Sequence, residues 1–409
     1  MSVPLDRLYN FLHDLCNHYD LVIYQFFPHG SKKITDLKRL DRKVYLSKKN
    51  PELGQAKYIF VHDQEPLNFD LYSGADIIDQ VIADEYVTRN LSQYLDEYNT
   101  ALIKEFLVRV LPELNLKIVS NLGQLWKIPV LLVHSEQRSQ NLQKYKNADF
   151  IGVYWWCHAV IARDWFRYAE HDPALCNRAP QKDFLIYNRA WSGTREYRLK
   201  FAELLIDHQL TEHCVMGFNC EDNGDYRQHQ FQNPRLQIQR QDLEEYFFYN
   251  DSPGTASADY NSIDYQSTQL EIVLETLFDD DRIQLTEKIL RPIACGHPFM
   301  LLSTVGSLEY LQQYGFKTFA HLIDETYDTI QDPLLRLQAV VAEMKRISNL
   351  PSDEKEKLYI ALRSIADYNC KLFFSKEWHD KIINEYQQNY ISARAELDRH
   401  HSLLISQLF

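Results

Sequence analysis

An α/β fold with two doubly wound domains is the architecture that the sequence predicts. The first observation is a series of short, continuous apolar runs, which are typical of strands covered on both faces in a parallel sheet. The second is the presence of helix-like segments between these runs, since alternating strands and helices are typical of doubly wound sheets. The third is that polar clusters follow the apolar runs, at the strand ends where such sheets bind ligands.

Six apolar runs are expected to be strands, because each is short and ends in polar or small residues. They lie at 21–27, 58–61, 130–133, 150–154, 184–187 and 299–302. Helices are expected at 5–18, 74–111, 115–126, 158–170, 194–209, 333–349, 352–368 and 376–407. The polar segment 221–264 has weak periodicity, so it is expected to be a long loop with a short strand or two.

Length and composition favour more than one domain. The chain has 409 residues, of which 45% are apolar and 13% aromatic, enough to fill the cores of two or three domains. Two prolines in a polar stretch place a domain break between 170 and 183. The expected parts are an N-terminal domain over 1–175, a C-terminal domain over 181–370 and a helical extension over 371–409.

The sequence carries no signal for a membrane or for export. No apolar run approaches the roughly 20 residues that a membrane-spanning helix needs. The N-terminus lacks a basic region followed by an apolar one, so no secretory signal is predicted. The seven cysteines are scattered and include no C-x-x-C pair, which favours reduced thiols in the cytoplasm over a structural zinc site.

The most informative stretch is 286–299, in which a Thr-Glu-Lys triplet opens an apolar helical turn that a Gly ends before a strand. Unpaired N–H groups and a positive dipole at a helix N-terminus suit a phosphate. Glu287 can accept hydrogen bonds from a ribose diol, and Lys288 can neutralise a diphosphate. The alternative is an ordinary capped helix, because Thr286 followed by an acid is common capping chemistry.

Three arginines follow the expected strand at 184–187 and surround a Gly turn that leads into a helix. Arginine binds phosphate through two parallel hydrogen bonds. Arg195 and Arg198 are three residues apart and therefore share a helix face. Arg189 directly follows the strand, where a side chain faces the ligand crevice. We expect phosphate contacts from Arg189 and one of the other two, the alternative being a solvated helix start with salt bridges.

The stretch 286–299 resembles the donor-site motif of GT-B glycosyltransferases, most closely that of fucosyltransferase-like enzymes and of related bacteriophage-encoded proteins. The resemblance extends over 268–319, and the strand that ends in Asn188 and Arg189 adds a weaker match. It implies two Rossmann-like domains that face a cleft, with the last helices packed back on the first domain.

The resemblance also implies a reaction and a donor. The donor would be a nucleoside diphosphate sugar, with a UDP-sugar favoured, and no metal would be required. Glu287 would hold the donor ribose, while Lys288 and an arginine would hold the diphosphate. Retaining enzymes of this kind often carry a second Glu eight residues later, where this chain has Cys295. The stereochemical outcome therefore stays open.

Candidates for a general base lie in the N-terminal half. Asp63 and Glu65 follow the expected strand at 58–61, and such a group could deprotonate an acceptor hydroxyl. The alternative is a turn in which Asp63 caps the backbone before Pro66. His158, at the end of another expected strand, is the second candidate, although it could equally be a satisfied core residue.

An acidic run at 279–281 has the D-x-D spacing of metal-dependent glycosyltransferases of another fold. Here it lies in a polar turn before the Thr-Glu-Lys helix, so a solvated acidic loop is the better interpretation. No metal site is expected.

The acceptor is predicted from a local reversal of charge. The net charge is -13, yet the segment 32–49 carries eight lysines and arginines against two aspartates. A basic stripe suits a polyanion, and the phage-like relatives make a modified base in DNA a reasonable acceptor. The alternatives are a solvated helix face with a glycan or small-molecule acceptor, and a nonenzymatic nucleotide-binding module. The oligomeric state stays open.

Overall fold

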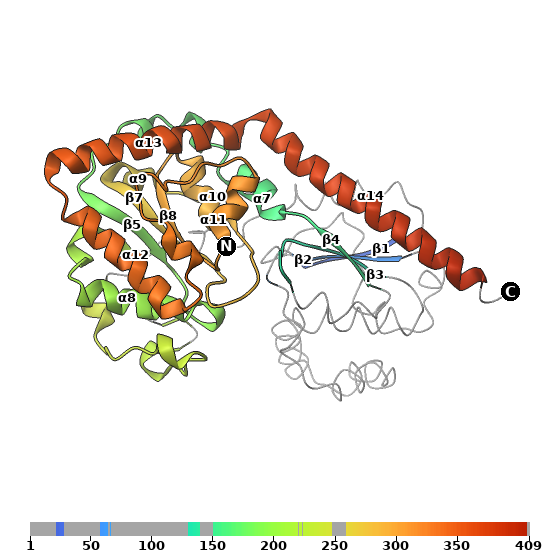
Figure 1. Cartoon of the computed structure of the whole chain (residues 1–409), viewed down its shortest axis with the longest axis horizontal. Coiled ribbons are helices and arrows are strands. Elements are labelled where there is room, and N and C mark those ends of the chain that lie inside the picture. The colour runs from blue at the N-terminus through green and yellow to red at the C-terminus, as the bar shows by residue number, and fades with distance from the viewer. Residues whose placement is uncertain are drawn as a thin grey trace, which may run out of the picture. The chain divides into compact units, whose positions relative to one another are not determined.

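A computed structural model describes two compact parts of the chain, each built on one parallel sheet (Figure 1). The first unit comprises Pro4–Cys157 with Ile383–Phe409, and the second comprises Met1–Val3 with His158–Ile382. The residues that the structure describes are 22–27, 58–63, 66, 130–139, 150–219, 221–222, 224–247 and 259–406.

The first unit contains a sheet whose four described strands are all parallel and run in the order β1-β2-β3-β4. These strands are β1 (Val22–Phe27), β2 (Tyr58–Asp63), β3 (Val130–His134) and β4 (Phe150–Tyr154). All four coincide with predicted strands. Their order in the sheet follows their order in the sequence, so the described strands contain no reversal of winding. The expected doubly wound order is therefore not seen among them.

The C-terminal helix α14 (Lys376–Ser406) passes from the second unit into the first, and the boundary falls at Ile382. Within the first unit, the Tyr386 ring packs on Trp155 with the ring centroids 4.7 Å apart. The Asn389 side-chain amide donates to the Tyr154 carbonyl at 2.8 Å. These contacts place this part of α14 beside the end of β4. The other boundary falls at His158, ahead of the predicted break at 170–183.

The second unit contains a parallel sheet in the order β6-β5-β7-β8. Its strands are β5 (Lys182–Asn188), β6 (Cys214–Phe218), β7 (Thr268–Leu274) and β8 (Phe299–Leu302). The chain starts at β5, adds β6 on one side, and then crosses back to add β7 on the other side. The winding therefore reverses between β5 and β7, and the carboxyl ends at such a reversal are where doubly wound sheets bind ligands.

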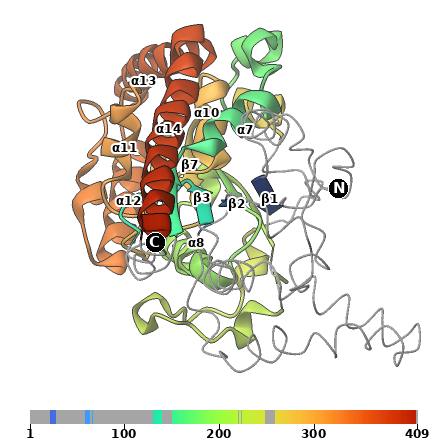
Figure 2. The ribbon, with the colours of Figure 1, turned by 90° about the vertical axis from the view of Figure 1, so that its right-hand side faces the viewer.

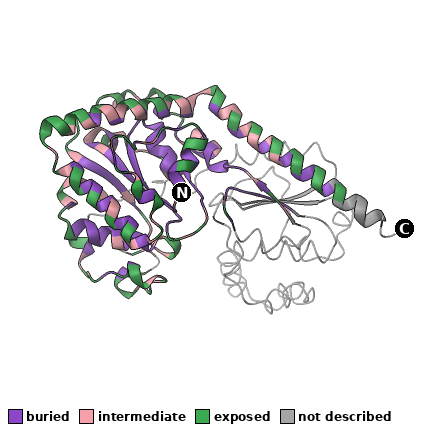
Figure 3. Ribbon diagram, in the orientation of Figure 1, coloured by how far each residue is buried: buried purple, intermediate pink, exposed green. Residues whose placement is uncertain are grey.

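Helices cover this sheet on both faces (Figures 1 and 2). On one face, α8 (Tyr197–Asp207) packs with α12 (Pro333–Ser348), and on the other α10 (Glu287–Ala294) packs with α13 (Ser352–Phe374). The remaining helices of the unit are α7 (Cys157–Trp165), α9 (Ser262–Ser267) and α11 (Ser307–Gln313). Figure 3 shows β5, β7 and β8 largely buried between the helices, whereas β6 is mostly half-buried.

Two strands of this sheet, β6 and β7, were not predicted as strands. The segment that contains β7 leads into the Thr-Glu-Lys helix, and Glu271 interrupts its apolar run. In the structure Glu271 is fully buried and forms an ion pair with Arg291 of α10, with 2.7 Å between nitrogen and oxygen. The Tyr265 hydroxyl donates to the same carboxylate at 2.6 Å. A buried carboxylate with such partners is compatible with a central strand.

The segment after β6 is held by two carboxylates, one at the N-cap of α8 and one within that helix. Among its described residues it forms three short 3-10 helices (Tyr226–Gln228, Pro234–Leu236 and Leu243–Glu245) and not the predicted strand. Glu196 accepts the backbone N–H groups of Gln232 and Asn233, each at 2.8 Å. Glu203 on α8 accepts the N–H group of Arg240 at 2.9 Å. Because these bonds join distant residues, local periodicity could not show them.

The first unit is expected to lose stability in acid through His134, the last residue of β3. Burial lowers the pKa of this imidazole to about 4, whereas in the unfolded chain it is about 6.5. Below pH 6.5 the unfolded chain binds a proton that the folded chain does not bind. The free energy of unfolding should therefore fall by about 3 kcal/mol between pH 6.5 and pH 4 and then level off.

Urea unfolding at a series of pH values tests this, with His134→Phe as the variant that cannot titrate. The variant should lack this part of the pH dependence. His171→Phe is the control, because that side chain is 83% exposed. Parallel pH profiles for wild type and His134→Phe would contradict the assignment.

Candidate functional site

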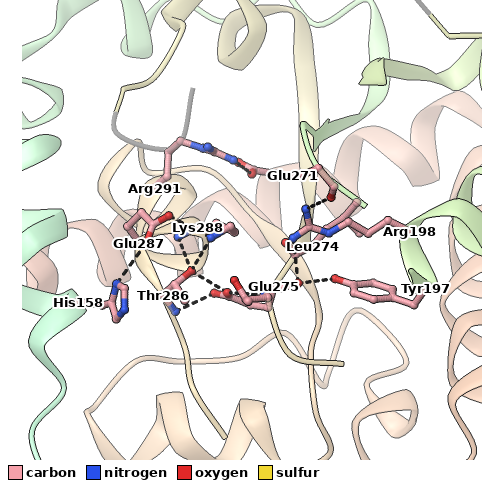
Figure 4. Close-up of polar contacts among 12 residues, drawn as sticks. His158, Tyr197, Arg198, Glu271, Leu274, Glu275, Thr286, Glu287, Lys288 and Arg291 are labelled. Atoms are coloured by element: carbon pink, nitrogen blue, oxygen red, sulfur yellow. Dashed lines mark hydrogen bonds and ion pairs between the residues drawn. The ribbon is translucent and has the colours of Figure 1, made fainter. Parts of the chain in front are cut away.

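The predicted donor motif lies at the start of α10, in the connection that follows β7 at the reversal of winding (Figure 4). Thr286 is the N-cap of the helix, and its hydroxyl oxygen accepts the Lys288 backbone N–H at 3.3 Å. Glu287 is the first helical residue. A helix start has unpaired N–H groups and a partial positive charge, so an anion is favoured there.

The cap is held by Glu275, which directly follows β7 and is fully buried. The Thr286 backbone N–H donates to one carboxylate oxygen at 3.0 Å, and the Thr286 hydroxyl donates to the other at 2.7 Å. Both oxygens of one carboxylate therefore bind one residue. This pair ties the end of the strand to the start of the helix.

Lys288 is held directly above the cap (Figure 4). Its ammonium donates to the Thr286 hydroxyl oxygen at 3.1 Å and to a Glu287 carboxylate oxygen at 3.0 Å. The side chain is 21% exposed, so the charge is only partly covered. The result is a positioned ammonium at the positive end of a helix, a suitable place for a phosphate.

Glu287 has a second partner in His158, which lies in the first turn of α7. The His158 Nδ1 atom is 3.2 Å from the Glu287 Oε2 atom, and both residues are buried, with exposed fractions of 5% and 6%. Burial by itself raises the pKa of Glu287, but the Lys288 ammonium and the His158 ring overcome it and hold this pKa well below its usual range. The carboxylate is therefore ionised at neutral pH.

The three predicted arginines have different environments. Arg198 is buried, and its guanidinium donates to the backbone carbonyls of Ala190 at 2.6 Å and Leu274 at 2.5 Å. It therefore joins the segment that follows β5 to the end of β7. Arg195 is half-buried and donates to the Ser192 carbonyl at 3.3 Å, whereas Arg189 is exposed.

The loop after β5 lies against the end of β7. The Thr194 hydroxyl donates to the Thr276 carbonyl at 2.8 Å, which brings the arginine loop beside the connection to α10. The backbone N–H groups of Trp191 and Ser192 both donate to one Asp222 carboxylate oxygen, at 2.7 and 2.8 Å. The loop that carries the predicted arginines is thus fixed by side-chain contacts at both of its ends.

The N-terminal candidates are only partly covered by the described residues. Asp63 is the last residue of β2, where its backbone pairs with Phe27 of β1. Glu65 and the basic segment 32–49 lie outside the residues that the structure describes. The predicted base and acceptor region in this half therefore stay predictions.

The acidic run at 279–281 is engaged by neighbouring side chains. The Asn233 amide donates to Asp279 at 2.7 Å, and Arg282 forms an ion pair with Asp280 at 2.7 Å. Among the described residues, no group of three or more His, Cys, Asp or Glu side chains is arranged to hold a metal ion.

Sequence reasoning missed Glu275, the residue that anchors the motif. Its only sequence signal is an acid at the end of an apolar run, followed eleven residues later by the Thr-Glu-Lys triplet. The structure also brings His158 to Glu287, a pairing that no local pattern indicates. The assembled site consists of Glu275, Thr286, Glu287, Lys288 and His158, all within the second unit.

Comparison of the chain with known protein families, with curated proteins and with solved structures gave no match. Among the described residues, no helix is both long enough and apolar enough to cross a bilayer.

Replacement of Glu275 by Ala is expected to destabilise the chain. The change leaves a buried N–H and a buried hydroxyl of Thr286 without their acceptor, at a cost of about 3 kcal/mol in the free energy of unfolding. Glu309→Ala is the matched control, because that residue is exposed on α11 and should change this free energy by less than about 0.5 kcal/mol. Denaturant unfolding measures both. Equal stability of the two variants would exclude an anchoring role for Glu275.

Proposed function

We propose that the second unit binds a nucleoside diphosphate sugar and that the protein is a glycosyltransferase that moves this sugar to an acceptor hydroxyl. The observation that carries the proposal is the Thr-Glu-Lys cap of α10, where an ionised Glu287 and the Lys288 ammonium stand together at a helix start. Support also comes from its place beside the reversal of winding between β5 and β7.

The roles follow from the chemistry of each group. Lys288 and the start of α10 would neutralise the diphosphate, and the Glu287 carboxylate would accept hydrogen bonds from the ribose hydroxyls. Arg189 and Arg195 are the arginines best suited to a further phosphate contact. Arg198 is less suited, because its guanidinium already donates to buried carbonyls. We favour a UDP-sugar as the donor, as the resemblance to GT-B glycosyltransferases implies. We also favour a reaction without a metal, because cationic side chains can stabilise the charge of the leaving diphosphate.

A GT-B arrangement is the proposed architecture. Two units that each contain a parallel sheet agree with it, as does a C-terminal helix whose last part belongs to the first unit. In such an enzyme the second unit would hold the donor and the first would supply the acceptor site. A nonenzymatic nucleotide-binding module is the alternative, and measurement of sugar transfer separates the two.

Glu287→Gln and Lys288→Met are each expected to weaken binding of a nucleoside diphosphate by about tenfold. Each substitution removes from the protein one charged group that would form a hydrogen bond with the ligand. Calorimetry with UDP, GDP and ADP measures the affinity. Lys357→Met is the control, since that side chain is 75% exposed on α13 and should leave the affinity unchanged. Wild-type affinity in both site variants would remove the donor-site assignment.

The proposed acceptor side rests on the sequence alone. Asp63 or Glu65 would deprotonate the acceptor hydroxyl, and the basic segment 32–49 would bind phosphates if the acceptor is a modified base in DNA. A glycan or a small molecule is the alternative acceptor, which needs no such basic stripe.

Asp63→Asn is expected to lower kcat for sugar transfer by at least about a hundredfold and to leave nucleotide affinity unchanged, because only the acceptor proton needs a base. Glu65→Gln is the paired variant, and one of the two should show this effect. Initial rates at saturating donor, together with calorimetry, separate the two quantities. If both variants turn over at the wild-type rate, the base lies elsewhere.

A further inference from the structure

We propose that His158 is a positioning residue for Glu287, which it holds in the orientation that accepts the ribose hydroxyls of the donor. This inference rests on the proposed function, and it gives His158 a different role from the general base that the sequence suggests. His158 would set nucleotide affinity in the second unit and would take no part in deprotonating the acceptor.

The carboxylate of Glu287 is held at both of its oxygens. Oε1 accepts the Lys288 ammonium at 3.0 Å, and Oε2 lies 3.2 Å from His158 Nδ1. Two contacts from opposite ends of a carboxylate fix the plane of the group as well as its position. Each oxygen keeps lone-pair capacity for a further hydrogen bond, so a ribose diol can still be accepted.

His158 comes from the first turn of α7, whereas Glu287 comes from the first turn of α10. Figure 4 shows the His158 ring beside the Glu287 carboxylate, on the side away from Arg291. Without the ring, the only charged partner of Glu287 among the described contacts would be its own neighbour in sequence, Lys288. The Lys288 side chain is partly exposed, and its ammonium is proposed to bind the diphosphate when the donor is present.

The same pairing has a rival interpretation. In hydrolase triads a carboxylate orients a histidine through Nδ1, and the opposite nitrogen acts as the base. Such a base must come within hydrogen-bond reach of the substrate proton. The two side chains are similarly buried, with exposed fractions of 6% for His158 and 9% for Glu287, so burial does not separate the two roles. The position of Glu287 favours the positioning role for His158, because Glu287 and not His158 contacts the Lys288 ammonium at the start of α10, where the diphosphate is proposed to bind.

The test compares His158→Ala with His158→Asn. The Asn amide nitrogen can take the place of Nδ1, so it should restore the contact that Ala removes. We expect the dissociation constant for the nucleoside diphosphate that the wild type binds best, among UDP, GDP and ADP, to rise about tenfold in His158→Ala. It should stay within about threefold of wild type in His158→Asn.

A double-mutant cycle adds the specific readout. In a Glu287→Gln background, His158→Ala should cause little further loss of affinity, because its effect acts through the Glu287 carboxylate. His171→Ala, at an exposed site, is the control and should bind as wild type does. In transfer assays, His158→Ala should raise the donor KM and leave kcat within about threefold of wild type.

The outcomes separate the inference from the proposed function. If the wild type binds none of the three nucleotides, the proposed function fails and the inference fails with it. If His158→Ala binds as tightly as wild type, or loses kcat at unchanged affinity, the inference alone is overturned. Nitrogen NMR of the wild-type chain gives a measurement that does not depend on variant folding. It should show a proton on His158 Nδ1, and a bare Nδ1 would also overturn the inference.

Discussion

The hydrogen bonds between Glu275 and Thr286 are the interaction on which the candidate site depends. They join the end of the central strand β7 to the first turn of α10, and the carboxylate that makes them is fully buried. A buried carboxylate is tolerated only when its oxygens are satisfied, so the strand end and the helix start must keep this one arrangement. This arrangement in turn sets the positions of Glu287 and Lys288, the two charged residues that follow Thr286.

A buried ion pair is a second connection between β7 and α10, in addition to the hydrogen bonds of Glu275. Glu271 lies in β7 itself, and it forms its buried ion pair with Arg291 one helical turn into α10. The helix has only eight residues, too few for helix propensity alone to stabilise it in water. Its position therefore depends on tertiary contacts, among them these two carboxylates, one in β7 and one directly after it, while Arg198 donates to the carbonyl of the last residue of β7. Residues in β7 or directly after it therefore contact both α10 and the arginine that lies at the start of α8.

The apolar runs predicted strands successfully where burial alone determines the structure. Continuous apolar sequence is sufficient for β5 and β8, because both faces of these strands meet helices. It failed for β7, since Glu271 interrupts the run and its partner Arg291 lies in a later element. It also failed for β6, whose one strand neighbour among the described residues is β5 and whose residues are mostly half-buried.

The sequence by itself determined the local chemistry of the site. A threonine before an acid and a lysine predicts a helix cap, and the structure has that cap at Thr286. Only the tertiary structure decided which distant groups meet it. The contact of His158 with Glu287, and the direction of Arg198 toward backbone carbonyls, depend on how α7 and α8 pack. Local periodicity reports which face of an element is buried, but it carries no information on which partner lies against that face.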